Sequence, residues 1–252
     1  MPLNHTDVTD AINEDRLVVH YQPQIDLATG AVSGVEALAR ILVDGNLAGP
    51  GDFVTAADTR SIAADFTLAV TAKVLAGAAD INRVHNCSTV SVNLLGHNLT
   101  DRSFPDRIAA LLRQYNLPGS TLMFEITETS SVSDLRNAGQ VLEGLTRLGC
   151  RLALDDFLTG NLGWDTFHRY NGWNEVKLDK SHVSTITTPD GARIISRIVS
   201  AASKRGCAVV AEGIEDSVTF TAAKAAGCTA AQGYHIARPM PYNRFLAWRN
   251  GC

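Results

Sequence analysis

Residues 32–40 read VSGVEALAR, and they follow residues 16–22, which read RLVVHYQ. Both runs are rich in apolar and β-branched residues, and a turn through Thr29-Gly30 lies between them. Two strand-like runs joined by a short connection that contains glycine predict an antiparallel pair. This hairpin is the feature that distinguishes the fold, because the remainder of the chain follows another rhythm.

After the hairpin, short apolar runs alternate with longer helical patterns. Further strands are expected at residues 88–93, 121–127, 151–155, 175–178, 208–212 and 229–232. Residues 50–79 are rich in alanine and predict one or two helices, and more helices are expected at residues 133–148, 191–204 and 218–226. Eight strands with helices between the later ones predict an α/β fold of the (βα)8 barrel type, from which the opening hairpin departs.

Length and composition fit one globular unit. The chain has 252 residues, of which 45% are hydrophobic and 19% are charged. A barrel reaches this size as a single domain, so we expect one domain over residues 1–252 with its core at about residues 16–246. The formal charge is −4 and no basic stripe is visible, which argues against binding to a nucleic-acid polymer.

The cysteines and the polar start of the chain indicate the compartment. Residues 1–16 contain no apolar signal core, and no apolar run approaches the ~18 residues of a membrane span. The five scattered cysteines form no CxxC pair, which is typical of a reducing environment. We therefore expect a cytoplasmic protein that does not insert into a membrane.

Three of the cysteines belong to a short repeat. Leu148-Gly149-Cys150, Arg205-Gly206-Cys207 and Ala226-Gly227-Cys228 each precede an expected strand. Glycine suits the left-handed position just after a helix end. The cysteines are expected to be small buried packing residues rather than reactive thiols.

Polar residues stand where the apolar strands end. They are Glu36, Asn93, Glu125, Asp155, Asp156, Lys177, Glu212 and Gln232. In a βα barrel these ends converge on one mouth, where active sites lie. Any single Asp at a strand end is more often a helix cap, but five carboxylates at one mouth would repel one another unless cations bind between them.

Oxygen ligands of this kind suit Mg²⁺ or Mn²⁺, and no histidine or cysteine cluster favours zinc. Adjacent residues on a strand point to opposite faces, so Asp155 and Asp156 can act together only if the backbone bends after the strand. Residues 157–160 could supply that bend. Lys177 would be held cationic among the carboxylates, or would carry a proton.

The ordered set of motifs resembles the EAL-domain family of cyclic-di-GMP-specific phosphodiesterases. The signature Glu36-Ala37-Leu38 with Arg40 follows Tyr21-Gln22-Pro23. The further matching motifs are Val92-Asn93-Leu94, Glu125-Ile126-Thr127-Glu128, Asp155-Asp156-Phe157, Lys177-Leu178-Asp179, Ala211-Glu212-Gly213-Ile214-Glu215, Gln232-Gly233-Tyr234 and Arg238-Pro239-Met240-Pro241. The resemblance covers residues 17–245 and implies a modified TIM-like barrel with an antiparallel first strand.

The resemblance also implies a chemistry, which is the hydrolysis of cyclic di-GMP to linear pGpG with two Mg²⁺ or Mn²⁺ ions per site. It assigns one metal to Glu36, Asn93, Glu125 and Asp155, and the second to Asp155 and Asp156 with Glu212 nearby. It gives catalytic roles to Glu36, Lys177, Glu212 and Gln232, and substrate contacts to Gln22, Leu38, Arg40, Asp179, Glu215 and Pro239. Glu128 would brace the loop after its strand, and a homodimer is expected.

One departure from the family pattern leaves an alternative open. The family usually has glycine where this chain has Leu158, in the loop at residues 158–164. If that position has a positive φ, leucine is strained there by roughly 1–2 kcal/mol. The chain could then be a weak or inactive EAL domain that acts as a cyclic-di-GMP receptor or a protein-interaction module. A metal-dependent barrel enzyme of unrelated chemistry, such as an aldolase, is the third reading.

Overall fold

The computed structural model describes residues 2–85, 89–127, 135–158 and 163–250. Its helices are α1 (His5–Asn13), α2 (Pro50–Ala57), α3 (Ala63–His85), α4 (Phe104–Tyr115), α5 (Leu135–Arg147), α6 (Gly163–Arg169), α7 (Lys180–Val183), α8 (Pro189–Ser203), α9 (Ser217–Ala225) and α10 (Tyr242–Asn250). Two short 3-10 helices are η1 (Gly96–Thr100) and η2 (Gly119–Thr121). The strands are β1 (Leu17–Asp26), β2 (Val32–Val43), β3 (Asn46–Ala48), β4 (Val90–Leu94), β5 (Leu122–Thr127), β6 (Arg151–Asp155), β7 (Glu175–Leu178), β8 (Ala208–Ala211), β9 (Ala230–Ala231) and β10 (Met240–Pro241).

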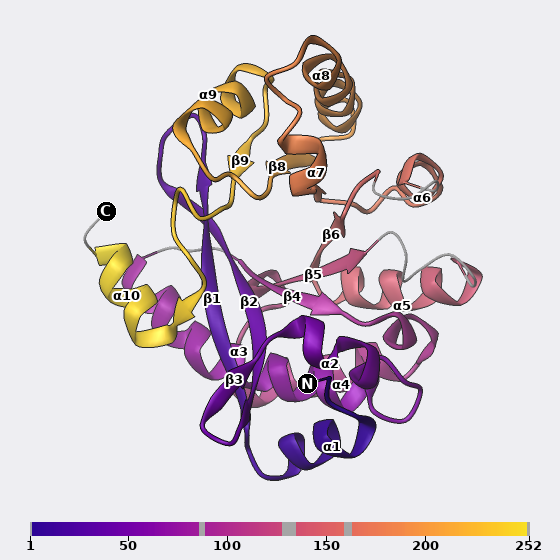
Figure 1. Cartoon of the computed structure of the whole chain (residues 1–252). Coiled ribbons are helices and arrows are strands. Elements are labelled where there is room, and N and C mark those ends of the chain that lie inside the picture. Colours follow the sequence, from indigo (N-terminus) through magenta and orange to yellow (C-terminus); the bar gives the residue numbers. More distant parts are fainter. Residues whose placement is uncertain (1, 86–88, 128–134, 159–162, 251–252) are drawn as a thin grey trace.

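Eight of the strands close into a barrel (Figure 1). From β2 to β9 by way of β4, β5, β6, β7 and β8, each strand pairs with its neighbour in parallel. Strand β1 closes the ring between β9 and β2, and it runs antiparallel to both. The predicted barrel with an antiparallel first strand is therefore confirmed. Two short strands outside the ring, β3 and β10, pair antiparallel with β2 and β1.

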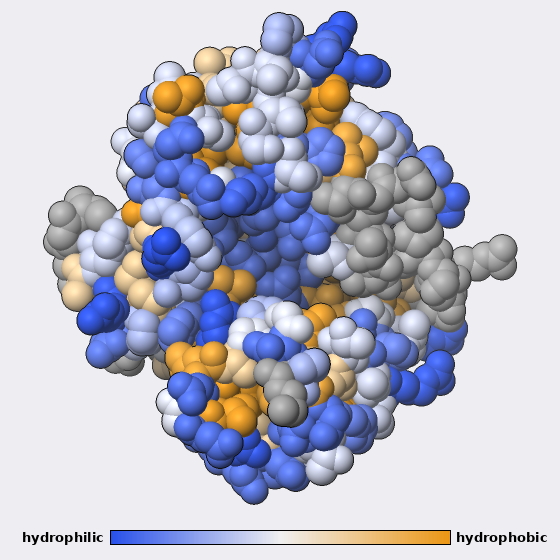
Figure 2. Space-filling view, viewed as in Figure 1, coloured by the Kyte–Doolittle hydropathy of each residue, from blue (hydrophilic) through white to orange (hydrophobic). Residues whose placement is uncertain are grey.

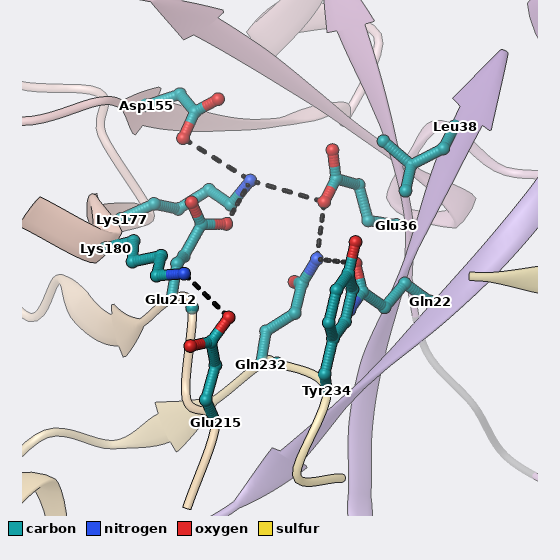
Figure 3. Close-up of a pocket in the computed structure, with 12 residues that line it drawn as sticks. Gln22, Glu36, Leu38, Asp155, Lys177, Lys180, Glu212, Glu215, Gln232 and Tyr234 are labelled. Carbon is teal, nitrogen blue, oxygen red and sulfur yellow. Dashed lines mark hydrogen bonds and ion pairs between the residues drawn. The ribbon is translucent and has the colours of Figure 1, made fainter. Parts of the chain in front are cut away.

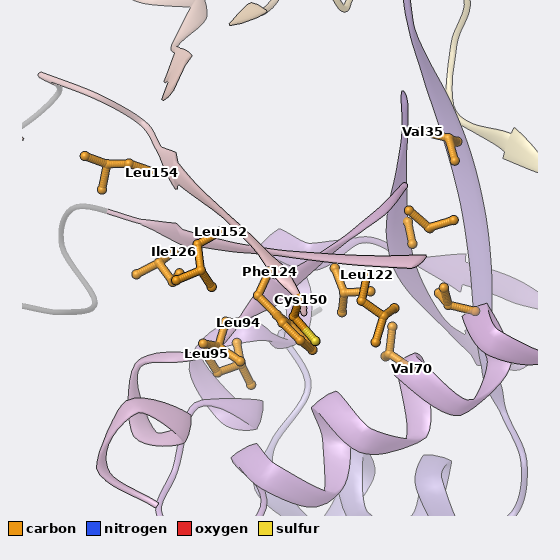
Figure 4. Close-up of a cluster of buried hydrophobic side chains, with 14 of the residues drawn as sticks. Val35, Val70, Leu94, Leu95, Leu122, Phe124, Ile126, Cys150, Leu152 and Leu154 are labelled. Carbon is orange, nitrogen blue, oxygen red and sulfur yellow. The ribbon is translucent and has the colours of Figure 1, made fainter. Parts of the chain in front are cut away.

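Side chains alternate across the barrel wall because successive residues of a strand point to opposite faces. On β5 and β6, Phe124, Ile126, Leu152 and Leu154 are fully buried, and Figure 4 shows them together on the side of the sheet where α3 lies. Their neighbours in the sequence, such as Glu125, take the opposite face. The outward positions thus hold the helices, and the inward positions are free to carry polar groups.

The helices cover the outside of this barrel. In Figure 1, α3, α4 and α5 lie along one part of the ring, α8 and α9 cover another, and α10 lies beside β1. The alanine-rich residues 50–79 were expected to form one or two helices. They form two, α2 and the longer α3. None of the helices in the described residues has the length and apolar character that a membrane crossing requires.

The glycine-cysteine repeat behaves as expected. Gly149, Gly206 and Gly227 have φ values of 85°, 66° and 88°, after α5, α8 and α9. The three cysteines that follow them are buried, and burial raises the pKa of Cys150 and Cys207 to about 12. These thiols are packing residues at the end of the barrel opposite the mouth.

The polar start of the chain was not predicted to be a helix, but it forms α1. Asn4 caps this helix, because its side chain accepts hydrogen bonds from the backbone N–H groups of Thr6 and Asp7. Val8 and Ala11 provide a small buried face.

That residues 1–252 are one domain stays a prediction.

Candidate active site

The polar strand ends come together at one mouth of the barrel. Asn93 on β4 pairs directly with Glu125 on β5. Ala153 and Leu154 on β6 pair with Glu175 and Val176 on β7, so the next residues, Asp155 and Lys177, stand side by side. The parallel register therefore delivers side chains from distant parts of the chain to the same place.

Lys177 lies at the centre of this group (Figure 3). Its Nζ is 2.7 Å from Glu212 Oε1, which Figure 3 draws, and 2.7 Å from Glu125 Oε2. Asp155 Oδ1 follows at 3.4 Å and Glu36 Oε2 at 3.7 Å. Only 1% of the lysine side chain is exposed. One buried ammonium thus neutralises part of a ring of four carboxylates, which we call the carboxylate ring (Glu36, Glu125, Asp155 and Glu212).

Side-chain amides hold Glu36 in place. Gln232 Nε2 donates to Glu36 Oε2 over 2.5 Å, and Asn93 Nδ2 donates to Glu36 Oε1 over 2.9 Å. Gln232 is itself bound, because its Nε2 also donates to Gln22 Oε1 and its Oε1 accepts from Gln24 Nε2. Both oxygens of Glu36 are therefore fixed by a buried amide network that joins β1, β2, β4 and the segment after β9.

Burial and mutual charge shift the pKa values of the ring. For Glu125, burial is the largest of the causes that raise the pKa well above its usual range. Burial also raises the pKa of Glu212 to about 8. Burial acts against the ammonium of Lys177, but the surrounding carboxylates raise its pKa well above its usual range. A cation is therefore held permanently inside the ring.

A pocket of about 290 Å³ opens above the ring. Its lining includes the predicted residues Gln22, Glu36, Leu38, Asp155, Lys177, Glu212, Glu215 and Gln232. In Figure 2 a hollow with hydrophilic walls lies near the centre of the face shown. The position of the pocket over the carboxylates makes it the candidate active site.

Besides Gly213 and Gly233, two residues with large side chains that line this pocket were missed by the sequence analysis. Lys180 pairs with Glu215 over 2.6 Å, and Tyr234 is 51% exposed with the Arg238 guanidinium 4.1 Å from its ring centroid. Tyr234 belongs to the Gln232-Gly233-Tyr234 motif, so the motif gave a signal that was not used. Lys180 gave none, since it follows its strand like many surface lysines.

Three of the predicted substrate-binding residues do not line this pocket, and one predicted residue lies outside the described chain. Asp179 caps α7 by accepting a hydrogen bond from Ser181 N–H over 2.8 Å, which is the ordinary role of an Asp after a strand. Arg40 donates to the carbonyl of Ala39 and, like Pro239, is not among the residues that line the pocket. Glu128 falls outside the described residues. The substrate contacts assigned to Arg40, Asp179 and Pro239 stay predictions.

The bend after β6 occurs, but it begins earlier than expected. Asp156 itself has a φ of 52°, and Leu158 has a φ of 68°. The bend turns Asp156 away from the alternation of the strand, and burial raises the pKa of its half-buried carboxyl to about 6. Leu158 therefore adopts the left-handed conformation that the sequence analysis identified as strained for leucine.

The donor set suits hard divalent cations. Glu125 Oε1 is buried and has no hydrogen-bond partner, and the other donors are carboxylate and amide oxygens, which Mg²⁺ and Mn²⁺ accept. In the described chain no group of three or more acidic, cysteine or histidine side chains forms a ready-made metal centre. The ligand types fit such metals, while Lys177 takes up the oxygens that they would need.

Comparison with known proteins identifies the family. A model of the EAL domain matches residues 5–239. Cyclic di-GMP phosphodiesterase RocR from Pseudomonas aeruginosa is 30% identical over 247 residues, which is 97% of this chain and 63% of that protein. Signaling protein YkoW from Bacillus subtilis is 29% identical over 238 residues, which is 94% of this chain and 30% of that protein.

Solved structures agree as well. The PaMucR phosphodiesterase in complex with c-di-GMP matches with a TM-score of 0.86 at 27% identity, over 95% of this chain and 98% of that chain. An EAL domain protein from Listeria monocytogenes has the same fold, with a TM-score of 0.84 at 23% identity over the whole of both chains.

Fold and site define a barrel protein with an acidic mouth. The chain belongs to the EAL domain family. It spans less than two thirds of the length of the curated relatives named above.

Proposed function

We propose that this chain is a metal-dependent phosphodiesterase that hydrolyses cyclic di-GMP to linear pGpG. The observation that carries the proposal is the carboxylate ring at the barrel mouth, where four acidic side chains surround Lys177 under an open pocket. Such a concentration of buried charge is costly for folding alone. It is understandable as a site that binds cations and, through them, an anionic diester.

The shape around the ring favours a substrate with two bases. A second cavity of about 270 Å³ adjoins the first, and the two share Glu36 and Leu38. Its walls are mainly apolar and include Phe53, Phe66 and Leu94. A cyclic dinucleotide carries two bases on its phosphodiester ring, so two adjoining cavities that share Glu36 match its form.

The ligands for the cations are the oxygens of the ring and its neighbours. We assign one cation to Glu36, Asn93, Glu125 and Asp155, and the other to Asp155 and Asp156 with Glu212. When bound, Mg²⁺ or Mn²⁺ supplies charge neutralisation of the diester and activation of a water molecule.

The remaining chemistry belongs to the chain. Gln232, fixed by Gln22 and Gln24, keeps Glu36 oriented toward the pocket. Glu212 is the most exposed member of the ring, and one of its oxygens lies 2.7 Å from the ammonium of Lys177, so its carboxylate is within reach of the pocket and held in position. We assign to Glu212 the proton released by the attacking water, and to Lys177 the positioning of Glu212.

The test is incubation of the purified protein with cyclic di-GMP and Mg²⁺ or Mn²⁺, with chromatographic separation of the products. We expect pGpG from the wild type and none from Asp155→Ala. Asp106→Ala, which removes an exposed carboxylate on α4, is the matched control and should leave the yield unchanged. Equal product from wild type and Asp155→Ala would contradict the proposed site.

A second function has one observation in its favour. The positive φ of Leu158 strains the loop that follows Asp155 and Asp156. If this strain blocks turnover, the protein is a cyclic-di-GMP receptor or a protein-interaction module instead. Calorimetry that shows binding of cyclic di-GMP, combined with recovery of the intact ligand, would favour this alternative.

Two further proposals rest on the family resemblance and on the cysteines. A homodimer is proposed from the resemblance, and light scattering of the purified protein tests it. A cytoplasmic location is proposed because Cys150, Cys207 and Cys228 are free thiols. Fractionation of cells that express the tagged protein tests the location.

A further inference from the structure

Lys177 occupies the place where the proposed cations would find most of their ligands. Its Nζ contacts one oxygen of each member of the carboxylate ring, at 2.7 Å for two of them and at 3.4 and 3.7 Å for the others. We propose that Lys177 is an internal cation that competes with the divalent metal for the carboxylate ring. This inference rests on the proposed metal-dependent function and deepens it, because it states what controls the affinity of the site.

The first argument is that Lys177 holds the four members of the ring together. Four carboxylates lie within 3.7 Å of a single point, and their side chains are between 0% and 18% exposed. Removing the partner of a buried charge leaves that charge uncompensated and destabilises the fold. Lys177 therefore keeps the ring assembled, so that the ligands are already in place when a metal arrives.

The second argument is that, among the described residues, the ion pairs of Lys177 are all made with members of the ring. Its side chain is 1% exposed and comes from β7, between β6 and β8. The ammonium cannot turn out to solvent without crossing the barrel mouth. A metal that takes Glu125 or Asp155 must therefore share the ring with Lys177 or push its ammonium toward another member.

The contacts indicate which ion pair of Lys177 breaks when a metal binds. Glu125 has one oxygen bound to Lys177, and the other is buried without a hydrogen-bond partner. Glu212 is the member nearest to solvent, with 18% of its side chain exposed. We infer that Lys177 keeps Glu212 and yields Glu125 when the metal binds. Lys177 is then a positioning residue whose competition weakens the metal site.

Lys180 provides a matched control in the same pocket. It carries the same charge, but its side chain is 57% exposed and pairs with Glu215 rather than with the ring. A general effect of positive charge on metal affinity should appear in Lys180→Met as well as in Lys177→Met. Direct competition for the ring should appear in Lys177→Met only.

The experiment measures Mn²⁺ binding by titration calorimetry on the whole chain, without substrate. We expect Lys177→Met to bind Mn²⁺ at least about tenfold more tightly than the wild type, because an opposing charge a few ångströms away is removed. Lys180→Met should stay within about twofold of the wild type, since exposed charges are screened. Equal or weaker binding by Lys177→Met would overturn the proposal.

Thermal unfolding gives a second readout that does not depend on activity. In EDTA, Lys177→Met should melt below the wild type, and Mn²⁺ should raise its Tm by more than it raises that of the wild type. Equal Mn²⁺-induced shifts would overturn the proposal.

Should Lys177→Met fail to fold, the pair Glu212→Gln and Lys177→Met/Glu212→Gln replaces it. The double variant should bind Mn²⁺ about tenfold more tightly than the single variant. Equal affinity of these two proteins would also overturn the competition.

The outcomes separate this inference from the proposed function. Wild type that binds Mn²⁺ but forms no pGpG defeats the phosphodiesterase and leaves the competition standing. Hydrolysis with equal Mn²⁺ affinity in wild type and Lys177→Met defeats the competition alone. Absence of Mn²⁺ binding in every variant defeats both.

Discussion

At the mouth of the barrel, Glu125 is fully buried, and the ammonium of Lys177 lies 2.7 Å from one of its oxygens. At the opposite end, Glu175 on β7 is also buried, and like Glu125 it has one oxygen, Oε1, without a hydrogen-bond partner. Both side chains belong to the inner wall of the same barrel. At the mouth a cation and amides contact the carboxylates, whereas at the far end burial outweighs the charges of Lys177 and Arg151 and raises the pKa of Glu175 to about 7.

This contrast separates two reasons for a buried acid. A carboxylate that touches Lys177 or Gln232 is part of a network of charged and polar groups, and its replacement should affect the chemistry. Glu175 is two residues from Lys177 in the sequence, but it faces the closed end of the barrel. Its replacement should affect stability and leave the chemistry intact.

The largest expected effect comes from replacing a glutamate of the barrel mouth with glutamine, compared with the same replacement at the far end of the barrel. Glu36→Gln keeps the shape of the side chain but removes a charge from the carboxylate ring, so we expect pGpG formation to fall by at least about 100-fold. Glu175→Gln should keep the rate within a factor of two. Steady-state product formation measures both, and comparable losses in the two variants would show that the ends do not differ in function.

The next effect is a pH dependence of stability at the far end. The pKa of Glu175 is raised from 4.5 to about 7 in the folded protein, so the folded state binds more protons than the unfolded state between these pH values. The contribution of Glu175 to the free energy of unfolding is therefore complete below about pH 4.5. It is lost as the pH rises through 7, by up to about 3 kcal/mol.

Denaturant unfolding of wild type and Glu175→Gln at pH 5 and pH 8 tests this dependence. From pH 5 to pH 8, the free energy of unfolding of Glu175→Gln should rise relative to that of the wild type by up to about 3 kcal/mol. Contributions of the mouth carboxylates cancel in this difference, because both proteins contain them. A constant difference between the proteins would mean that Glu175 has an ordinary pKa.

The smallest expected effect concerns the loop at the mouth. Leu158→Gly relieves the left-handed strain of roughly 1–2 kcal/mol, but it loses the packing of the leucine and gains flexibility in the unfolded chain. Net stability should change by less than about 1 kcal/mol, while kcat should rise by no more than about tenfold.

Leu158→Ala is the control for this loop. Alanine removes the same packing but keeps the strain, because it has a Cβ atom. A rise in kcat for glycine and not for alanine identifies the backbone as the cause. The same kcat in both variants would mean that the conformation of Leu158 does not limit turnover.

Much of the barrel could be predicted because each strand and helix signals itself locally. The strand at residues 151–155 and the strand at 175–178 have the predicted bounds, and most of the others differ by one to a few residues. The helix α1 was missed because its capping residue Asn4 and its two buried residues make a short, polar pattern. The strand β3 was missed because three residues carry too little periodicity.

The candidate site was predictable in part. Polar residues at or near the ends of apolar strands marked Glu125 and Glu212 without any structure, whereas Glu36 lies within β2 rather than at its end. The pattern did not distinguish Asp179, which caps a helix, from Asp155, which enters the ring. Both residues follow an apolar strand, and the difference between them lies in the direction of the side chain.

The amino-acid order alone thus specified the alternation of the strands, the glycine turns and the types of group at the mouth, because these depend on neighbours within a few positions. The packed barrel was needed to bring Lys177 within reach of four acids that lie up to 176 residues apart, from Glu36 to Glu212. It was also needed to place the bend at Asp156 and to seat Lys180 and Tyr234 at the pocket. Those features arise from contacts between distant segments, which no local pattern encodes.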